Sequence, residues 1–195
     1  MLSERQKQII VESILLIDSK GVHGFTIKNL SKEIGISEPG IYRHFESKSD
    51  ILYTILETFR QEIEIYQHST VQKSSNPMDL FHEYFDQIFE NFINNPALTS
   101  VVLSEEIFRD EERLMTKVSE IQGLNEQLLL GLLMKMKRKK VIAPEFDSEM
   151  FVIVFFGSVR FLVRQWKNTG YSFDLRSKGV DLFQTLSGFL RAPHV

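Results

Sequence analysis

A short polar stretch, residues 37–48, carries the groups best suited to contact nucleic acid. Tyr42 can hydrogen-bond a phosphate, or it can merely pad the head. His44 taken alone is a surface histidine, and it and Lys48 become phosphate candidates only through the family resemblance described below. Glu38 can accept a hydrogen bond from the N4 amino group of cytosine, although an acid here is equally typical of the solvated start of a helix. Phosphate contacts fix register and base contacts select sequence, so this stretch has the chemistry to do both.

Two short helices joined by a tight turn are expected to position these groups, over about residues 26–45. Thr26 can cap the first helix and Ser37 the second, with Pro39 in the first turn. Gly35 suits the sharp turn, because glycine takes positive φ without steric cost. The second helix is polar on its outer side, which predicts a helix–turn–helix that enters the major groove of DNA. The expected DNA contacts are Thr26, Lys28, Ser37, Glu38, Pro39, Gly40, Tyr42, Arg43, His44 and Lys48.

At these residues the sequence resembles the TetR/AcrR family of transcriptional regulators. The resemblance rests on the capping Thr26, the turn at Gly35, the Tyr-x-x-Phe pattern of residues 42–45 and the following Lys48. Ser31 stands where the family commonly has alanine, and it is small enough to keep the helices close. The resemblance covers about the first quarter of the chain. It implies a homodimeric regulator, expected to be a repressor, that binds double-stranded palindromic operator DNA.

Composition narrows the class of protein. The chain has 195 residues, 43% of them hydrophobic, with sixteen phenylalanines, which is ample for a packed core. It has no cysteine, which fits a reducing cytoplasm. No run of apolar residues predicts a membrane span or a signal peptide, so we expect a cytoplasmic protein with no membrane partner.

Charge favours a site-specific DNA binder over a general DNA coat. The net charge is −3, and the first 50 residues hold seven Lys and Arg against seven Asp and Glu. Any positive surface must therefore be local, built by Lys28, Arg43, Lys48 and helix N-termini.

Helical periodicity without strand signals predicts an all-α protein of about nine helices. We expect a DNA-binding head over residues 1–47, a linking helix over about 48–66, and a larger effector-binding and dimerisation domain over 67–195. Residues 68–77 are polar and predict a loop. The remaining helices are expected over about 3–20, 78–94, 96–108, 111–140, 147–166 and 174–191.

The penultimate helix has an apolar arc wider than one packing face, so it should be covered from two sides. A core on one side and a second subunit on the other satisfy this, and the resemblance implies dimerisation through the last two long helices. Which stripe faces the partner stays open. The expected interface residues are Val159, Val163, Trp166, Phe183, Leu186 and Leu190.

Aromatic residues of the larger domain predict a hydrophobic interior. Such residues are usually core, yet a dry aromatic interior can also hold an apolar ligand, here an aromatic or acyl effector. The expected ligand-binding residues are Tyr84, Phe85, Phe108, Phe151 and Phe155.

Other charged or ligating residues are interpreted as structural. The basic run 134–140 suits a helix C-terminus, and Arg160 and Arg164 belong to a polar strip. The acids of residues 104–112 have no histidine at ligand spacing, so no metal, cofactor or catalytic residue is expected. A regulator without a small-molecule effector and an all-α enzyme or carrier remain as alternatives.

Overall fold

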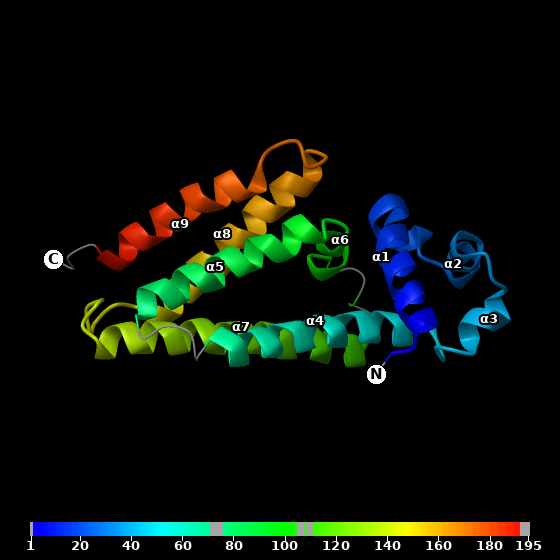
Figure 1. Cartoon of the computed structure of the whole chain (residues 1–195), viewed down its shortest axis with the longest axis horizontal. Coiled ribbons are helices and arrows are strands. Elements are labelled where there is room, and N and C mark those ends of the chain that lie inside the picture. Colours follow the sequence, from blue (N-terminus) through cyan, green and yellow to red (C-terminus); the bar gives the residue numbers. More distant parts are fainter. Residues whose placement is uncertain (1, 71–75, 105–107, 109–110, 192–195) are drawn as a thin grey trace. The chain divides into compact units, whose positions relative to one another are not determined.

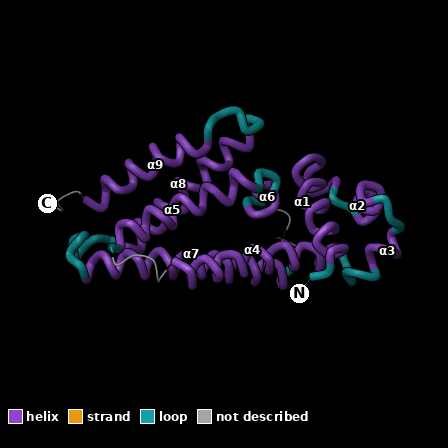
Figure 2. Tube along the Cα trace, viewed as in Figure 1, coloured by secondary structure: helices purple, strands orange, loops and turns teal. Residues whose placement is uncertain are grey.

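The computed structural model describes residues 2–70, 76–104, 108 and 111–191, without the side chains of 66–70. Within these residues the protein is all-α, as predicted (Figures 1 and 2). The described helices are α1 (Glu4–Gly24), α2 (Ile27–Ile34), α3 (Glu38–Tyr42), α4 (Lys48–Thr70), α5 (Pro77–Asn94), α6 (Leu98–Val102), α7 (Glu112–Arg138), α8 (Ser148–Asn168) and α9 (Leu175–Arg191). No helix in this part of the chain has both the length and the apolar character needed to cross a membrane.

The predicted cap of α2 is confirmed, and α1 begins with a cap of its own. Ser3 and Gln6 form a reciprocal capping box at the start of α1. The Thr26 hydroxyl accepts from the Asn29 amide at 3.1 Å, which fixes where α2 begins. Gly35 ends α2 with φ of 75°, the left-handed conformation expected for the turn.

Two helix boundaries differ from the sequence prediction. Helix α4 continues to Thr70, so the predicted loop over 68–77 is wrong for residues 68–70, while 71–75 lie outside the described residues. Residues 68–70 contain neither proline nor glycine, so nothing in their sequence stops the helix before Thr70. Helix α6 ends at Val102 rather than near Phe108, which the structure places in a turn.

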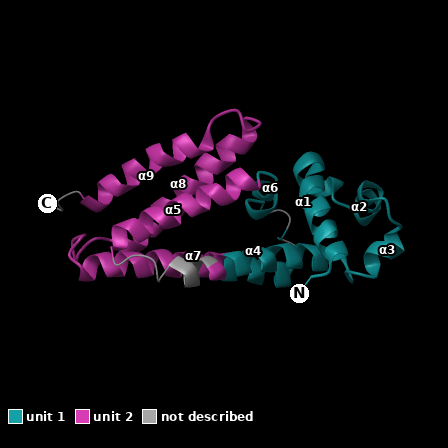
Figure 3. Cartoon of the chain, in the orientation of Figure 1, with its two compact units in different colours: residues 1–62, 96–121 teal, residues 63–95, 122–195 magenta. Residues whose placement is uncertain are grey.

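The chain forms two compact units (Figure 3). Unit 1 comprises residues 1–62 and 96–121, and unit 2 comprises 63–95 and 122–195. Helices α4 and α7 each contribute to both units, so these boundaries do not follow the expected division at residues 47 and 67.

Each unit has its own core. In unit 1, α1 packs against α2 and α6, and α2 packs against α3. In unit 2, α5 and α8 both pack against α9. Buried core residues of unit 1 include Ile9, Phe25, Leu30, Ile41 and Ile55, and those of unit 2 include Phe81, Phe85, Leu133, Phe155 and Val163.

Candidate nucleic-acid interface

Helix α2 turns its apolar side inward and leaves its first residues accessible. Leu30 is fully buried and Ser31 nearly so, whereas Thr26 and Lys28 are exposed. The Ser31 hydroxyl donates to the Lys28 carbonyl at 2.9 Å, so its buried polar group is satisfied within the helix. A serine at this position therefore fits the packing of the head, as expected.

Helix α3 separates buried anchors from exposed polar residues. Ile41 and Phe45 are buried, while the Ser37 hydroxyl accepts from the Gly40 amide at 3.3 Å. Tyr42 is 51% exposed although the residue before it is buried, which leaves its phenol free to reach a ligand. The exposed candidates of this segment are Ser37, Glu38, Pro39, Tyr42 and Arg43.

Gly40 is buried, but the head does not need a glycine there for space. A Cβ built at Gly40 would lie 3.4 Å from the Ser37 Oγ and 3.6 Å from the Ile36 Cβ, which are ordinary contacts. An interior glycine costs about 1 kcal/mol relative to alanine. Close approach of a DNA phosphate to the backbone would explain the glycine.

His44 and Lys48 are half-buried and held by neighbours from other elements. The Gln6 side-chain amide donates to the His44 carbonyl at 3.3 Å, which ties α1 to the end of the recognition segment. The Lys48 ammonium lies 5.0 Å from the centre of the Phe25 ring. Burial lowers the pKa of Lys48, and the Glu111 carboxylate opposes that shift. This hydrogen bond between Gln6 and His44 was not predicted from the sequence, because it joins residues that are 38 positions apart.

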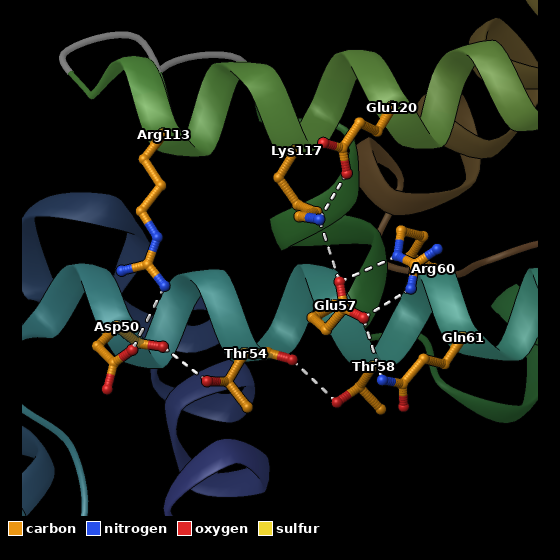
Figure 4. A network of polar contacts seen from close by, with 9 residues as sticks. All are labelled: Asp50, Thr54, Glu57, Thr58, Arg60, Gln61, Arg113, Lys117 and Glu120. Carbon is orange, nitrogen blue, oxygen red and sulfur yellow. Dashed lines mark hydrogen bonds and ion pairs between the residues drawn. The ribbon is translucent and has the colours of Figure 1, made fainter.

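A charged network joins α4 to α7 within unit 1 (Figure 4). The Arg60 guanidinium donates to the Glu57 carboxylate at 2.8 and 3.0 Å, and the Lys117 ammonium lies 3.2 Å from the same carboxylate. Lys117, almost fully buried, also donates to Glu120 at 2.5 Å. Hydrogen bonds from Arg60, and then from Lys117, hold the pKa of Glu57 at about 2 despite its partial burial. Hydrogen bonds to Glu120 and Glu57 raise the pKa of Lys117, so both groups stay charged.

The same pair of helices also meets closer to the head. The Arg113 guanidinium lies 3.8 Å from the centre of the Tyr53 ring. It also faces the Asp50 carboxylate at 3.9 Å, a contact drawn in Figure 4. The Ser49 hydroxyl donates to the Glu111 carboxylate. The start of α7 is therefore attached to the first turns of α4, the helix that begins with Lys48.

Four of the five predicted ligand-binding residues meet in unit 2. The rings of Tyr84, Phe85 and Phe151 lie 6.0, 5.8 and 6.4 Å from the ring of Phe155, which is fully buried. Phe108 is buried in unit 1 and so does not belong to this cluster.

The predicted ligand-binding set lacked two further rings of this aromatic cluster and one polar neighbour. The Phe81 ring lies 5.8 Å from that of Phe155, and the Phe183 ring lies 5.2 Å from that of Phe85. The Tyr84 hydroxyl donates to the Asn125 side chain at 3.1 Å, which adds a polar group on α7.

The predicted interface residues lie mostly inside the protomer. Val159, Val163, Trp166, Leu186 and Leu190 are buried, and Phe183 is half-buried. The apolar side chains that α8 and α9 leave exposed are different ones. They are Met150, Ile153, Val154, Phe161, Val180 and Phe189.

Two glycines lie on the same exposed faces, Gly157 on α8 and Gly188 on α9. A Cβ added at either would meet no described atom within 4 Å, so nothing in the protomer requires the small residue. Val154 and Phe161 lie one turn to either side of Gly157, and both are exposed. An exposed glycine flanked by exposed apolar side chains is typical of a surface where another helix approaches closely.

The other charged residues singled out in the sequence, where the structure describes them, do not form a second candidate binding site. Lys135, Lys137 and Arg138 occupy the last turn of α7, as expected for a helix C-terminus. Arg160 is half-buried and Arg164 exposed on α8. Part of the acidic run 104–112 and His194 lie outside the described residues. Among the residues that are described, no three or more His, Cys, Asp or Glu gather into a group that could hold a metal ion.

Comparison with known proteins confirms the resemblance seen in the sequence. Residues 9–54 match the family model described as bacterial regulatory proteins, tetR family. The match begins in α1 and ends in α4, so it includes the whole helix–turn–helix.

Similar proteins extend this comparison beyond the head. The nucleoid occlusion factor SlmA of Mannheimia succiniciproducens is 28% identical over 119 residues, which are 60% of this chain and 55% of that protein. The fatty acid degradation regulator FadR from Bacillus halodurans superposes with a TM-score of 0.82 at 21% identity, covering 95% of this chain and 96% of that one. The regulator FadR from Bacillus subtilis, solved in complex with stearoyl-CoA, gives 0.81 at 19% identity, covering 96% and 99%. At these identities the two structures show a shared fold over 95% and 96% of this chain.

Proposed function

We propose that this chain, which carries the DNA-binding domain of tetR-family bacterial regulators, is a transcriptional repressor that binds a palindromic operator as a homodimer. The observation that carries the proposal is the geometry of α3. Ile41 within the helix and Phe45 just after it are buried and anchor it in the head, while Tyr42 and its polar neighbours are exposed. A recognition helix needs this division, because it must be fixed to the protein on one side and enter the major groove on the other.

The homodimer is supported by the exposed faces of α8 and α9. Ile153, Phe161 and Phe189 are 65%, 63% and 53% exposed, which is costly for large apolar side chains of a lone protomer. The open space at Gly157 and Gly188 would let a second pair of helices approach closely. A second copy offers the same apolar faces, so a two-fold interface is self-complementary.

A hydrophobic effector is supported by the aromatic cluster around Phe155. Its rings supply apolar surface, and the Tyr84–Asn125 pair supplies a polar group at its edge. The structural neighbour FadR from Bacillus subtilis was solved in complex with stearoyl-CoA, which supports the choice of an acyl molecule. We therefore propose an aromatic or acyl molecule that binds the DNA-incompetent arrangement of the dimer better than the competent one.

Selection from a pool of random duplexes tests the DNA-binding proposal. Wild-type protein should retain duplexes that share a two-fold symmetric sequence, since protein symmetry is mirrored in the half-sites. Retention of unrelated sequences alone would contradict a site-specific regulator.

A compound screen on the selected duplex tests the effector. A hydrophobic effector should raise the melting temperature of the free protein and lower its affinity for the duplex, as linkage requires. Phe155→Trp inserts extra volume among packed rings, so it should abolish this response while DNA binding persists. Phe161→Tyr, on the exposed face of α8, is the matched aromatic control and should respond like the wild type.

A second candidate is a DNA-bound factor that needs no small-molecule effector. The name of the curated relatives, nucleoid occlusion factor, favours it. If no hydrophobic compound shifts melting temperature or DNA affinity while specific DNA binding is present, this candidate replaces the effector-released repressor. Mapping of bound sites on the chromosome would then show sites spread widely rather than confined to a few promoters.

A further inference from the structure

An acidic residue lies next to a cation that the proposed function assigns to DNA. Glu111 immediately precedes α7, and its carboxylate accepts a hydrogen bond from the Ser49 hydroxyl in the first turn of α4. Lys48 is the residue before Ser49, and its ammonium is held over the Phe25 ring. Glu111 thus holds a negative charge at the N-terminal end of α4, where the proposed function places a DNA phosphate.

The attachment of Glu111 is not an isolated contact. Two residues further on, Arg113 stacks on Tyr53 and faces Asp50, and Lys117 pairs with Glu57. These contacts fix the register of the first turns of α7 on α4. Glu111 therefore stays beside Ser49 as long as the start of α7 keeps this position.

The electrostatic consequence is direct. Burial lowers the pKa of Lys48, and the Glu111 carboxylate held at Ser49 acts in the opposite direction by stabilising the ammonium. A carboxylate that stabilises the ammonium competes with phosphate for the same cation.

We infer that Glu111 is a positioning residue that weakens DNA binding by keeping its carboxylate beside Lys48. The inference rests on the proposed function, in which Lys48 contacts a phosphate. The inference adds a means of regulating DNA binding. If the start of α7 moves away from Ser49, the Glu111 carboxylate moves with it and Lys48 becomes available to a phosphate.

Glu111→Gln tests the inference, because glutamine keeps an acceptor for the Ser49 hydroxyl and removes the charge. DNA affinity of the full-length protein is measured by fluorescence anisotropy on a duplex retained in the selection, over a series of salt concentrations. Glu112→Gln is the matched control, since it removes the same charge one residue further along in the exposed first turn of α7. Thermal melting of each variant establishes that it is folded.

Glu111→Gln should bind roughly three- to tenfold more tightly as a dimer than Glu112→Gln, since the substitution removes the carboxylate that competes for Lys48 at each of the two heads. Its affinity should also fall more steeply with salt, because Lys48 then displaces counterions fully. In a Lys48→Met background the difference between Glu111→Gln and Glu112→Gln should disappear.

Two results would overturn the inference while leaving the proposed function intact. In the first, Glu111→Gln and Glu112→Gln bind DNA equally. In the second, the gain from Glu111→Gln is undiminished in the Lys48→Met background. A wild-type protein that retains no duplex overturns both proposals, so the two failures are distinguishable.

Discussion

Tyr42 is the side chain of α3 whose exposure most needs a ligand to explain it. If its phenol contacts a phosphate, Tyr42→Ala should weaken binding to every duplex by on the order of 1 kcal/mol per head, felt twice in a dimer. Tyr42→Phe should lose nearly as much, because it removes only the hydroxyl. Anisotropy titrations on several duplexes measure both, with melting temperature as the check of folding. Unchanged binding, or altered preference at one base pair alone, would refute the phosphate contact.

Replacement by alanine should have different effects at Gly40 and at Gly35, on DNA affinity at the first and on thermal stability at the second. Gly40→Ala places a methyl at ordinary contact distance, so thermal stability should hold while DNA affinity falls. Gly35→Ala forces alanine into φ of 75° and should cost about 1 kcal/mol of stability. Melting curves and DNA titrations of both variants separate the two effects. Normal DNA binding by Gly40→Ala would show that the backbone there does not approach DNA.

The ionisation of Glu57 makes the free energy of unfolding depend on pH in the acid range. Its pKa is lowered from 4.5 to about 2, chiefly by the hydrogen bond from Arg60, so its contribution is present above about pH 4.5. That contribution, up to about 3 kcal/mol, should be lost as pH falls toward 2. Glu57→Gln should therefore unfold with a flatter pH dependence over this range, measured by urea denaturation. Glu145→Gln, exposed in the loop after α7, is the control and should keep the wild-type profile.

At the scale of elements, the sequence predicts contacts between residues that are close in the chain, but not contacts between distant residues. Thr26, Gly35 and Ser37 act through atoms a few residues away, so sequence spacing was enough to place α2 and α3. The contacts of Lys117 with Glu57 and of Glu111 with Ser49 join residues about sixty positions apart. No local pattern carries that information, because it depends on how α7 packs on α4.

The apolar arc of α8 shows the same limit from another side. Its width predicts two covered faces, but periodicity alone does not say which face packs in the protomer. The structure buries Val159, Val163 and Trp166 and leaves Ile153 and Phe161 exposed, so cover of the second face by another subunit stays a prediction. The candidate interface consequently moves by about half a helical turn around α8 relative to the residues first expected.

Substitutions on the two faces of α8 should behave differently. Phe161→Glu places a charge on the exposed face, so it should yield a folded monomer. Val163→Glu places a carboxylate at a fully buried position, which costs several kcal/mol and should unfold the protein. Light scattering with circular dichroism distinguishes these outcomes. A dimeric Phe161→Glu variant would remove this face from the interface.

At the scale of the whole molecule, the proposed function depends on two heads acting together. The first 50 residues carry seven basic and seven acidic side chains, so one head has little general attraction for DNA. In the proposed homodimer, two heads on one duplex would multiply their modest affinities, because the second head binds intramolecularly. On this proposal, dimerisation is as important for specific binding as any single contact of α3.

The most direct test of the account is the mass of the protein–DNA complex, measured by sedimentation on a selected duplex with two half-sites. A matched duplex has one half-site scrambled. The account predicts two protomers on the symmetric duplex and a large loss of affinity when one half-site is scrambled. The account would be contradicted if one protomer bound each duplex and if the symmetric and the scrambled duplex were bound with equal affinity.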